Sequence, residues 1–208
     1  MTEDNIQALK DDIAFMRALA QEGSSAPLLF GGVLFSAGLI FGAGAVGHWL
    51  IASGVLKVSG WAYLINWSLA GVAFGVVMSV ILNRSKGRPG YSAGVNKATG
   101  VAWSGVGFAI FTLFLGLTVI GLVSGNWAAM AVIPVVIFAL YGTCWFIAGA
   151  LSNTGWIKGV AFASFAAAVG MAALTGNPYQ MLAYAAGLIL LATLPGLILM
   201  RQEPADIV

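Results

Sequence analysis

Few residues of this chain have side chains that could do acid–base, nucleophilic or metal chemistry. The 208 residues include one histidine, His48, and one cysteine, Cys144. A single ligand cannot assemble a metal site, and His48 stands beside Trp49 near the expected end of an apolar segment, as an interfacial residue would. Cys144 lies in an apolar run, where a thiol packs as a small hydrophobe. We therefore predict no catalytic, metal-binding or cofactor-binding residue.

The elements that would have to position such groups are almost free of charge. Charged residues make up 8% of the chain, hydrophobic residues make up 60%, and the mean hydropathy is +0.96. A soluble domain carries about 25% charged residues, so this supply cannot cover a water-facing surface. The composition predicts an integral membrane protein in a lipid bilayer. A net charge of +2 is too small to indicate a nucleic-acid partner.

Six apolar runs are each long enough to cross a bilayer as a helix, which takes ~20 residues. The runs lack the period-two alternation of a transmembrane barrel, and no polar helices separate them as in an α/β protein. The expected fold is all-α and polytopic, with six transmembrane helices as three hairpins and an N-terminal cytoplasmic amphipathic helix. The expected segments are the N-terminal helix within 1–26, a membrane domain of 27–201 with helices at 28–51, 61–82, 99–123, 128–151, 156–174 and 179–200, and a tail of 202–208.

The lysines and arginines predict the orientation of these helices, because cytoplasmic loops carry an excess of them. With six crossings, eight of the nine basic residues fall on one side and only Lys57 falls on the other. Both termini are therefore expected in the cytoplasm, with a bacterial inner membrane as the expected location. The eight are Lys10, Arg17, Arg84, Lys86, Arg88, Lys97, Lys158 and Arg201.

The N-terminal segment is expected to bind protein rather than lipid. Ile6, Leu9, Ile13 and Met16 recur at spacings of three and four, so they would form one apolar stripe on a helix. A helix that lies on a membrane surface is usually basic on its polar face, whereas five acids accompany two bases here. Docking could involve the chain's own loops, a second copy or another subunit. A solvated helix without a partner is the alternative.

A basic link between the second and third expected helices carries Arg84, Lys86, Arg88 and Lys97. The simpler interpretation is that these charges set the topology of the chain. The second interpretation is that they bind the acids of the N-terminal segment. Salt should weaken such a contact, because exposed charges are screened within ~10 Å at 0.1 M ionic strength.

Small and polar residues within the spans indicate how the helices pack. Gly38-x-x-x-Gly42 and Gly71-x-x-x-Gly75 fit the pattern of close helix approach, so we expect a tight hairpin between the first two helices. Asn66 is the most costly intramembrane group to leave unpaired, since its amide has two donors and an acceptor. We expect it to make an interhelical contact or to line a pore.

Two prolines interrupt expected helices. Pro134 and Pro195 lack a backbone N–H, so each leaves the carbonyl four residues earlier, of Met130 and of Leu191, without its helical donor. A kink is the ordinary consequence of such an interruption. A gating hinge is the alternative.

Three classes of function follow from these patterns. The favoured hypothesis is a non-enzymatic subunit or interaction partner in a membrane assembly, either as a homo-oligomer or with another membrane subunit. The alternative is a small channel or facilitator for an uncharged or weakly polar solute. A membrane enzyme is disfavoured, because its chemistry calls for placed acids, bases or metal ligands, and the spans contain no Asp, Glu, Lys or Arg.

Overall fold

The computed structural model of the chain describes residues 12–13, 27–88 and 90–203, and every regular element in these ranges is a helix. Six helical stretches there are long and apolar enough to cross a membrane, which confirms the all-α, multi-pass prediction. Two of the six stretches change helix type along their length. The elements are α2 (Gly31–Ala52), α3 (Trp61–Ser85), α4 (Gly94–Ser124), the 3₁₀ helix η1 (Ala128–Val132), α5 (Ile133–Leu151), α6 (Gly155–Ala173), α7 (Gln180–Leu188), the π-helix η2 (Ile189–Thr193) and α8 (Leu194–Gln202).

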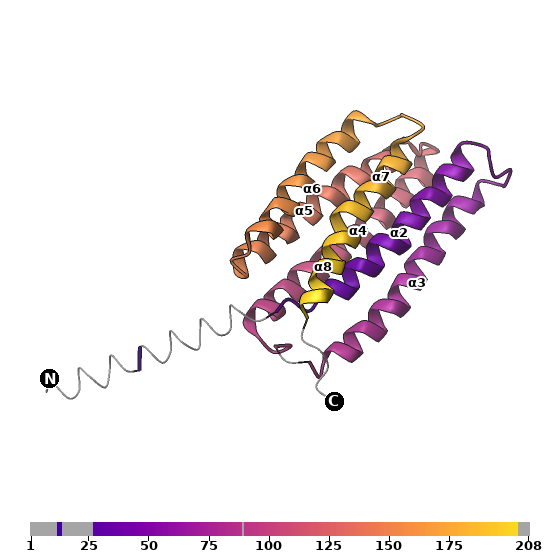
Figure 1. Ribbon diagram of the computed structural model, residues 1–208. Coiled ribbons are helices and arrows are strands. Elements are labelled where there is room, and N and C mark those ends of the chain that lie inside the picture. The colour runs from indigo at the N-terminus through magenta and orange to yellow at the C-terminus, as the bar shows by residue number, and fades with distance from the viewer. Residues whose placement is uncertain (1–11, 14–26, 89, 204–208) are drawn as a thin grey trace, which may run out of the picture.

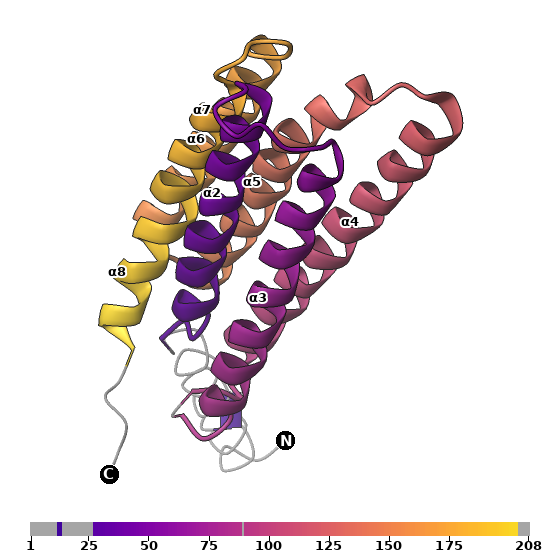
Figure 2. The ribbon, with the colours of Figure 1, turned by 90° about the vertical axis from the view of Figure 1, so that its right-hand side faces the viewer.

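The helices form two rows of three. In one row α5 packs between α4 and α6, and in the other α2 packs between α3 and the combined helix of α7, η2 and α8. Figure 2 shows α3 and α4 on one side of the molecule, with α6, α7 and α8 on the other. The consecutive helices α2 and α3 pack on each other, and so do α4 and α5. The third expected hairpin differs, because α6 packs mainly on α5 and makes few contacts with α7.

Large side chains fill the space between the two rows. Phe138 and Trp145 of α5 are completely buried, and they point towards the opposite row. The Phe138 ring lies 5.3 Å from the ring of Tyr184 in α7, and the Trp145 ring lies 5.9 Å from that of Phe30. Aromatic pairs at such distances stabilise beyond their buried area. The core is therefore a seam of rings between the rows.

The backbones of α2 and α8 approach each other closely. A Cβ atom added at Gly31 would lie 2.8 Å from the carbonyl oxygen of Gly196, and one added at Gly196 would lie 2.7 Å from the carbonyl oxygen of Gly31. Only residues without a side chain allow two helix backbones to approach this closely. The first and last membrane helices are thereby joined.

The two prolines act near helix starts rather than in the middle of α-helices. Pro134 lies in the first turn of α5, directly after η1, and Pro195 lies in the first turn of α8, directly after η2. Each interruption therefore appears as a change of helix type.

The helices α3 and α4 are peripheral. Only 6% of the most apolar stretch of each is buried, against 28–50% in the other four membrane-length helices. Their outward faces carry large apolar side chains such as Leu69, Val72 and Phe108, which are about two-thirds or more exposed. In a bilayer this surface faces lipid or another protein.

Candidate functional site at the basic end of the bundle

Most of the charged residues that the structure describes lie at one end of the bundle. Figure 1 shows the α3–α4 link, the α5–α6 link, the start of α2 and the end of α8 at this end, and the opposite end carries Lys57. We call it the basic end. Its basic residues are Arg84, Lys86, Arg88, Lys97, Lys158 and Arg201.

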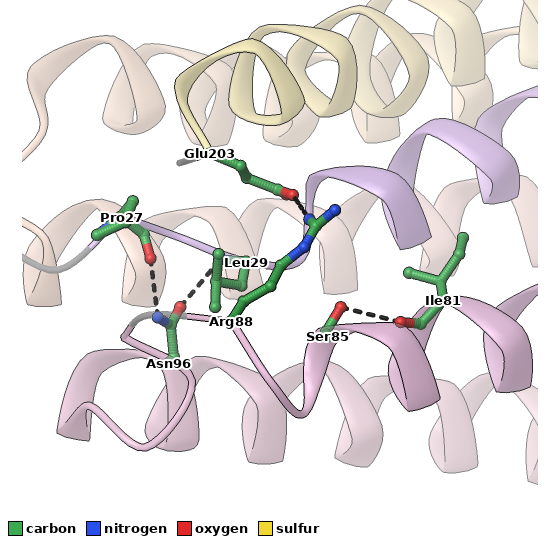
Figure 3. A network of polar contacts seen from close by, with 7 residues as sticks. All are labelled: Pro27, Leu29, Ile81, Ser85, Arg88, Asn96 and Glu203. Carbon is green, nitrogen blue, oxygen red and sulfur yellow. Dashed lines mark hydrogen bonds and ion pairs between the residues drawn. The ribbon is translucent and has the colours of Figure 1, made fainter. Parts of the chain in front are cut away.

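Asn96 in the first turn of α4 holds the start of the first membrane helix. Its side-chain Oδ1 accepts the backbone N–H of Leu29 at 3.1 Å. Its Nδ2 donates to the carbonyl of Pro27 at 2.8 Å (Figure 3). The same Nδ2 donates to the carbonyl of Gly90 at 3.0 Å. Both the oxygen and the nitrogen of the Asn96 amide thus have hydrogen-bond partners. These bonds tie residues 27–29 to the α3–α4 link. We call this set of contacts the Asn96 clasp.

The clasp explains why two expected helix boundaries differ from the structure. Leu28 and Leu29 are buried but not helical, because Asn96 satisfies their stretch of backbone, and α2 begins only at Gly31. At the other boundary α4 starts at Gly94, five residues before the expected Thr99. Val95 in this extra turn is buried, so the turn packs on the bundle although Asn96 and Lys97 interrupt its apolar pattern.

An ion pair ties the same link to the end of α8. The Arg88 guanidinium donates to the Glu203 carboxylate, and Glu203 follows the last residue of α8 (Figure 3). The Glu203 side chain is only 8% exposed, so water screens this pair less than it screens an open surface pair. This is the one ion pair between the residues that the structure describes. Arg88 of the basic link is therefore engaged by the C-terminal end of α8.

Ser85 lies beneath these contacts at the last residue of α3. Its side chain is 4% exposed, and its hydroxyl donates to the carbonyl of Ile81 at 2.9 Å. This bond satisfies the hydroxyl within its own helix (Figure 3). The start of α2, the α3–α4 link and the end of α8 thus form one joined structure at the basic end.

The remaining residues of the predicted basic loop face outward. Arg84, Lys86 and Lys97 are all exposed, and the Lys86 ammonium donates to the Asn83 side chain at 2.9 Å. Lys97 is adjacent to Asn96, so it is carried on the same first turn of α4 as the clasp. The structure therefore divides the predicted loop into one engaged residue, Arg88, and three exposed ones.

The predicted partner-docking stripe lies mostly outside the described residues. This applies to Ile6, Leu9 and Met16. Asp12 and Ile13 are helical and exposed. The amphipathic helix and its docking role therefore stay predictions.

The side chains of His48 and Cys144 both pack among other side chains of the helices. Nδ1 of His48 accepts the indole N–H of Trp67 at 3.1 Å, and the His48 ring packs 4.7 Å from that of Tyr63. Cys144 is 1% exposed in the core of α5. Within the described ranges no group of three or more His, Cys, Asp and Glu gathers in one place. Both residues contribute to helix packing in this arrangement.

Asn66 makes an interhelical contact. Its Nδ2 donates to the carbonyl of Gly44 in α2 at 2.8 Å, and a Cβ added at Gly47 would lie 2.5 Å from its Oδ1. The Asn66 amide and the Trp67 ring of α3 therefore pack against glycines of α2, and these contacts hold the two helices together. Gly44 and Gly47 were not singled out in the sequence, because their spacing of three departs from the four-residue pattern.

The expected pairing of two glycine motifs is corrected by the structure. Gly38 and Gly42 of α2 face Thr193 and Ile189 of η2, not α3. Over Gly71 and Gly75 of α3 there is open space, with no atom within 4 Å of an added Cβ. A local glycine pattern marks a face where a helix could be approached, but the topology decides which helix is there.

Comparisons with known proteins give the chain no relatives. No family model matches it, and no curated protein and no solved structure is significantly similar to it.

Proposed function

We propose that this chain is a non-enzymatic subunit of a membrane assembly that presents its N-terminal segment to a protein partner on the cytoplasmic face. The observation that carries this proposal is the Asn96 clasp. Its three hydrogen bonds hold residues 27–29, the point at which the N-terminal segment joins the bundle. The segment is thus tethered to a fixed place on a packed helical body.

The partner's chemistry follows from the segment's residues. The apolar stripe of Ile6, Leu9, Ile13 and Met16 suits a hydrophobic groove that takes an amphipathic helix. The five acids around it favour a groove with a basic rim. A second copy of the chain and another membrane subunit both fit this description. The expected setting is the inner membrane of a bacterium, with both termini in the cytoplasm.

Photo-crosslinking in native membranes tests the proposal. A photoreactive amino acid is placed in turn at Ile6, Leu9, Ile13 and Met16, with Ala18 as the control because it would lie on the opposite face of the helix. We expect the stripe positions to yield a discrete protein adduct and Ala18 to yield much less. Adducts to lipid alone, or equal adducts from both faces, would contradict the proposal.

The alternative function has its own assay. The purified chain is reconstituted alone in liposomes, and the entry of small uncharged solutes is measured by light scattering. We expect the rate to equal that of empty liposomes. Faster entry that depends on the chain would favour a channel or facilitator over a subunit.

A further inference from the structure

Charge is divided between two parts of the chain. The seven acidic residues all lie outside residues 23–202, and five of them fall within the first 22 residues. These five acids, Glu3, Asp4, Asp11, Asp12 and Glu22, accompany only Lys10 and Arg17. The bundle has the opposite balance, because six basic residues gather at its basic end, where Glu203 is the one acid among the described residues. The two parts are electrostatically complementary.

Three exposed side chains form the cationic surface. Arg84 ends α3, Lys86 follows it, and Lys97 projects from the start of α4. All three are exposed, and Glu203, the acid at this end, is already engaged by Arg88. We call Arg84, Lys86 and Lys97 the cationic surface. The ion pair between Arg88 and Glu203 does not neutralise these three positive charges.

Lys97 stands where a helix normally carries an acid. The N-terminus of α4 has the positive end of the helix dipole, its first turn contains no acidic residue, and its N-cap Ala93 has no capping side chain. A basic residue next to this end is locally unfavourable. An anionic group brought to this place would relieve the repulsion.

The chain brings its own acids to this place. Asn96, the neighbour of Lys97, holds Pro27, and Glu22 lies only five residues before Pro27 in the sequence. Five residues span at most ~17 Å when extended, so Glu22 cannot move far from the clasp. Asp11 and Asp12 are about fifteen residues away, which is ~22 Å along a helix. The acids are therefore present at a high effective concentration around the cationic surface.

We propose that residues 1–26 of this chain dock on the cationic surface of the same chain through Asp11, Asp12 and Glu22. On a helix Asp11 and Glu22 would lie opposite the apolar stripe, so docking would leave the stripe facing a partner. This inference rests on the proposed function, because it sets where the stripe is presented to that partner. The contact is made of exposed pairs, so it is weak and sensitive to salt.

Distance measurement between two spin labels tests the docking on the full chain. Labels are placed by Gln7→Cys and Ser92→Cys in a Cys144→Ala background, and the protein is held in nanodiscs of zwitterionic lipid. We expect a population at short distance that falls at least about threefold as salt rises from about 0.05 to about 0.5 M. Neutralising the segment with Asp11→Asn, Asp12→Asn and Glu22→Gln should cause a similar loss. These changes leave the bundle untouched, so they do not endanger its folding.

A second variant neutralises the other side of the contact. Arg84→Gln, Lys86→Gln and Lys97→Gln together should also remove the short-distance population, whereas Lys57→Gln at the opposite end should retain it. A distance distribution that ignores salt and both sets of substitutions would overturn the proposal. The variant with Arg84→Gln, Lys86→Gln and Lys97→Gln could instead lose binding to vesicles with about 30% phosphatidylglycerol while its distances stayed the same. This result would also overturn the proposal, since the cationic surface would then bind lipid headgroups.

The two proposals fail in different ways. If docking is absent but the stripe still forms a protein adduct in native membranes, only the docking is wrong. If docking occurs in nanodiscs and no protein adduct forms in membranes, the proposed function is wrong and the segment serves its own chain alone.

Discussion

The indole N–H of Trp145 in α5 donates to the carbonyl oxygen of Leu191 in η2 at 3.0 Å. Pro195 has no N–H, so it cannot supply the α-helical donor that this carbonyl would otherwise have. Trp145 is completely buried, and the bond lies between the two rows of helices. A side chain from one row thus satisfies the backbone group that a proline exposes in the other.

Replacing Trp145 by phenylalanine should therefore destabilise the protein. The change removes the buried hydrogen bond to the Leu191 carbonyl, which costs about 1–2 kcal/mol, and it adds a small cavity. The free energy of unfolding, measured by denaturant titration in detergent, should fall by at least this amount. In a Pro195→Ala background the cost should shrink, because the alanine N–H can reach the same carbonyl.

Trp103 provides a matched control for this experiment. Its ring packs 5.6 Å from that of Trp145, but its indole nitrogen is buried without a hydrogen-bond partner. Trp103→Phe removes a similar volume and loses no hydrogen bond. We expect it to cost less than Trp145→Phe. An equal cost would show that ring volume, not the bond to Leu191, is what stabilises the seam.

Replacing Asn96 by alanine should loosen the basic end specifically. The substitution removes three hydrogen bonds and leaves the Leu29 N–H without a partner, for an expected loss of about 2 kcal/mol. Amide hydrogen exchange should rise at residues 27–31 and around Gly90, while the α5–α6 pair stays protected. Asn83→Ala is the control, since Asn83 is exposed and bonds only Lys86 among described residues. Uniformly raised exchange along the chain would argue against a local clasp.

The membrane fold could be predicted because its signal is local. A run of ~20 apolar residues is itself the condition for a spanning helix, so the expected 156–174 lies within one residue of α6 (Gly155–Ala173). The boundary at Gly94 was missed, because α4 continues beyond its apolar run into the charged turn of Asn96 and Lys97. Polar residues end a hydropathy signal, but they do not end a helix.

Contacts between distant segments could not be predicted in the same way. Asn96 receives its partners from Pro27 and Leu29, 67 or more residues earlier, and from Gly90. A lone asparagine in a polar link gives no sign of such partners. The Pro195 interruption was visible in the sequence, and the Leu191 carbonyl four residues earlier accepts a side-chain N–H. That Trp145 would be the donor depends on how the two rows pack, which no local pattern encodes.

Alanine substitutions in the two glycine motifs test the observed packing, because they should have opposite effects on stability. A Cβ at Gly38 would lie 2.7 Å from the backbone nitrogen of Thr193, so Gly38→Ala must push α2 away from η2 at a cost of about 1–3 kcal/mol. At Gly71 an added Cβ meets nothing within 4 Å. Gly71→Ala should therefore keep or slightly raise stability, by up to about 1 kcal/mol, since alanine favours the helix.

Thermal unfolding of the two variants in the same detergent makes the comparison, with Gly75→Ala as a second outward-facing position. Gly71→Ile, which would have loosened an α2–α3 contact through this motif, should leave the unfolding temperature of the single chain unchanged. Loss of stability at Gly71 equal to that at Gly38 would mean that α3 turns this face towards a neighbour. If that loss appeared only at protein concentrations where the wild-type chain self-associates, the neighbour would be a second copy.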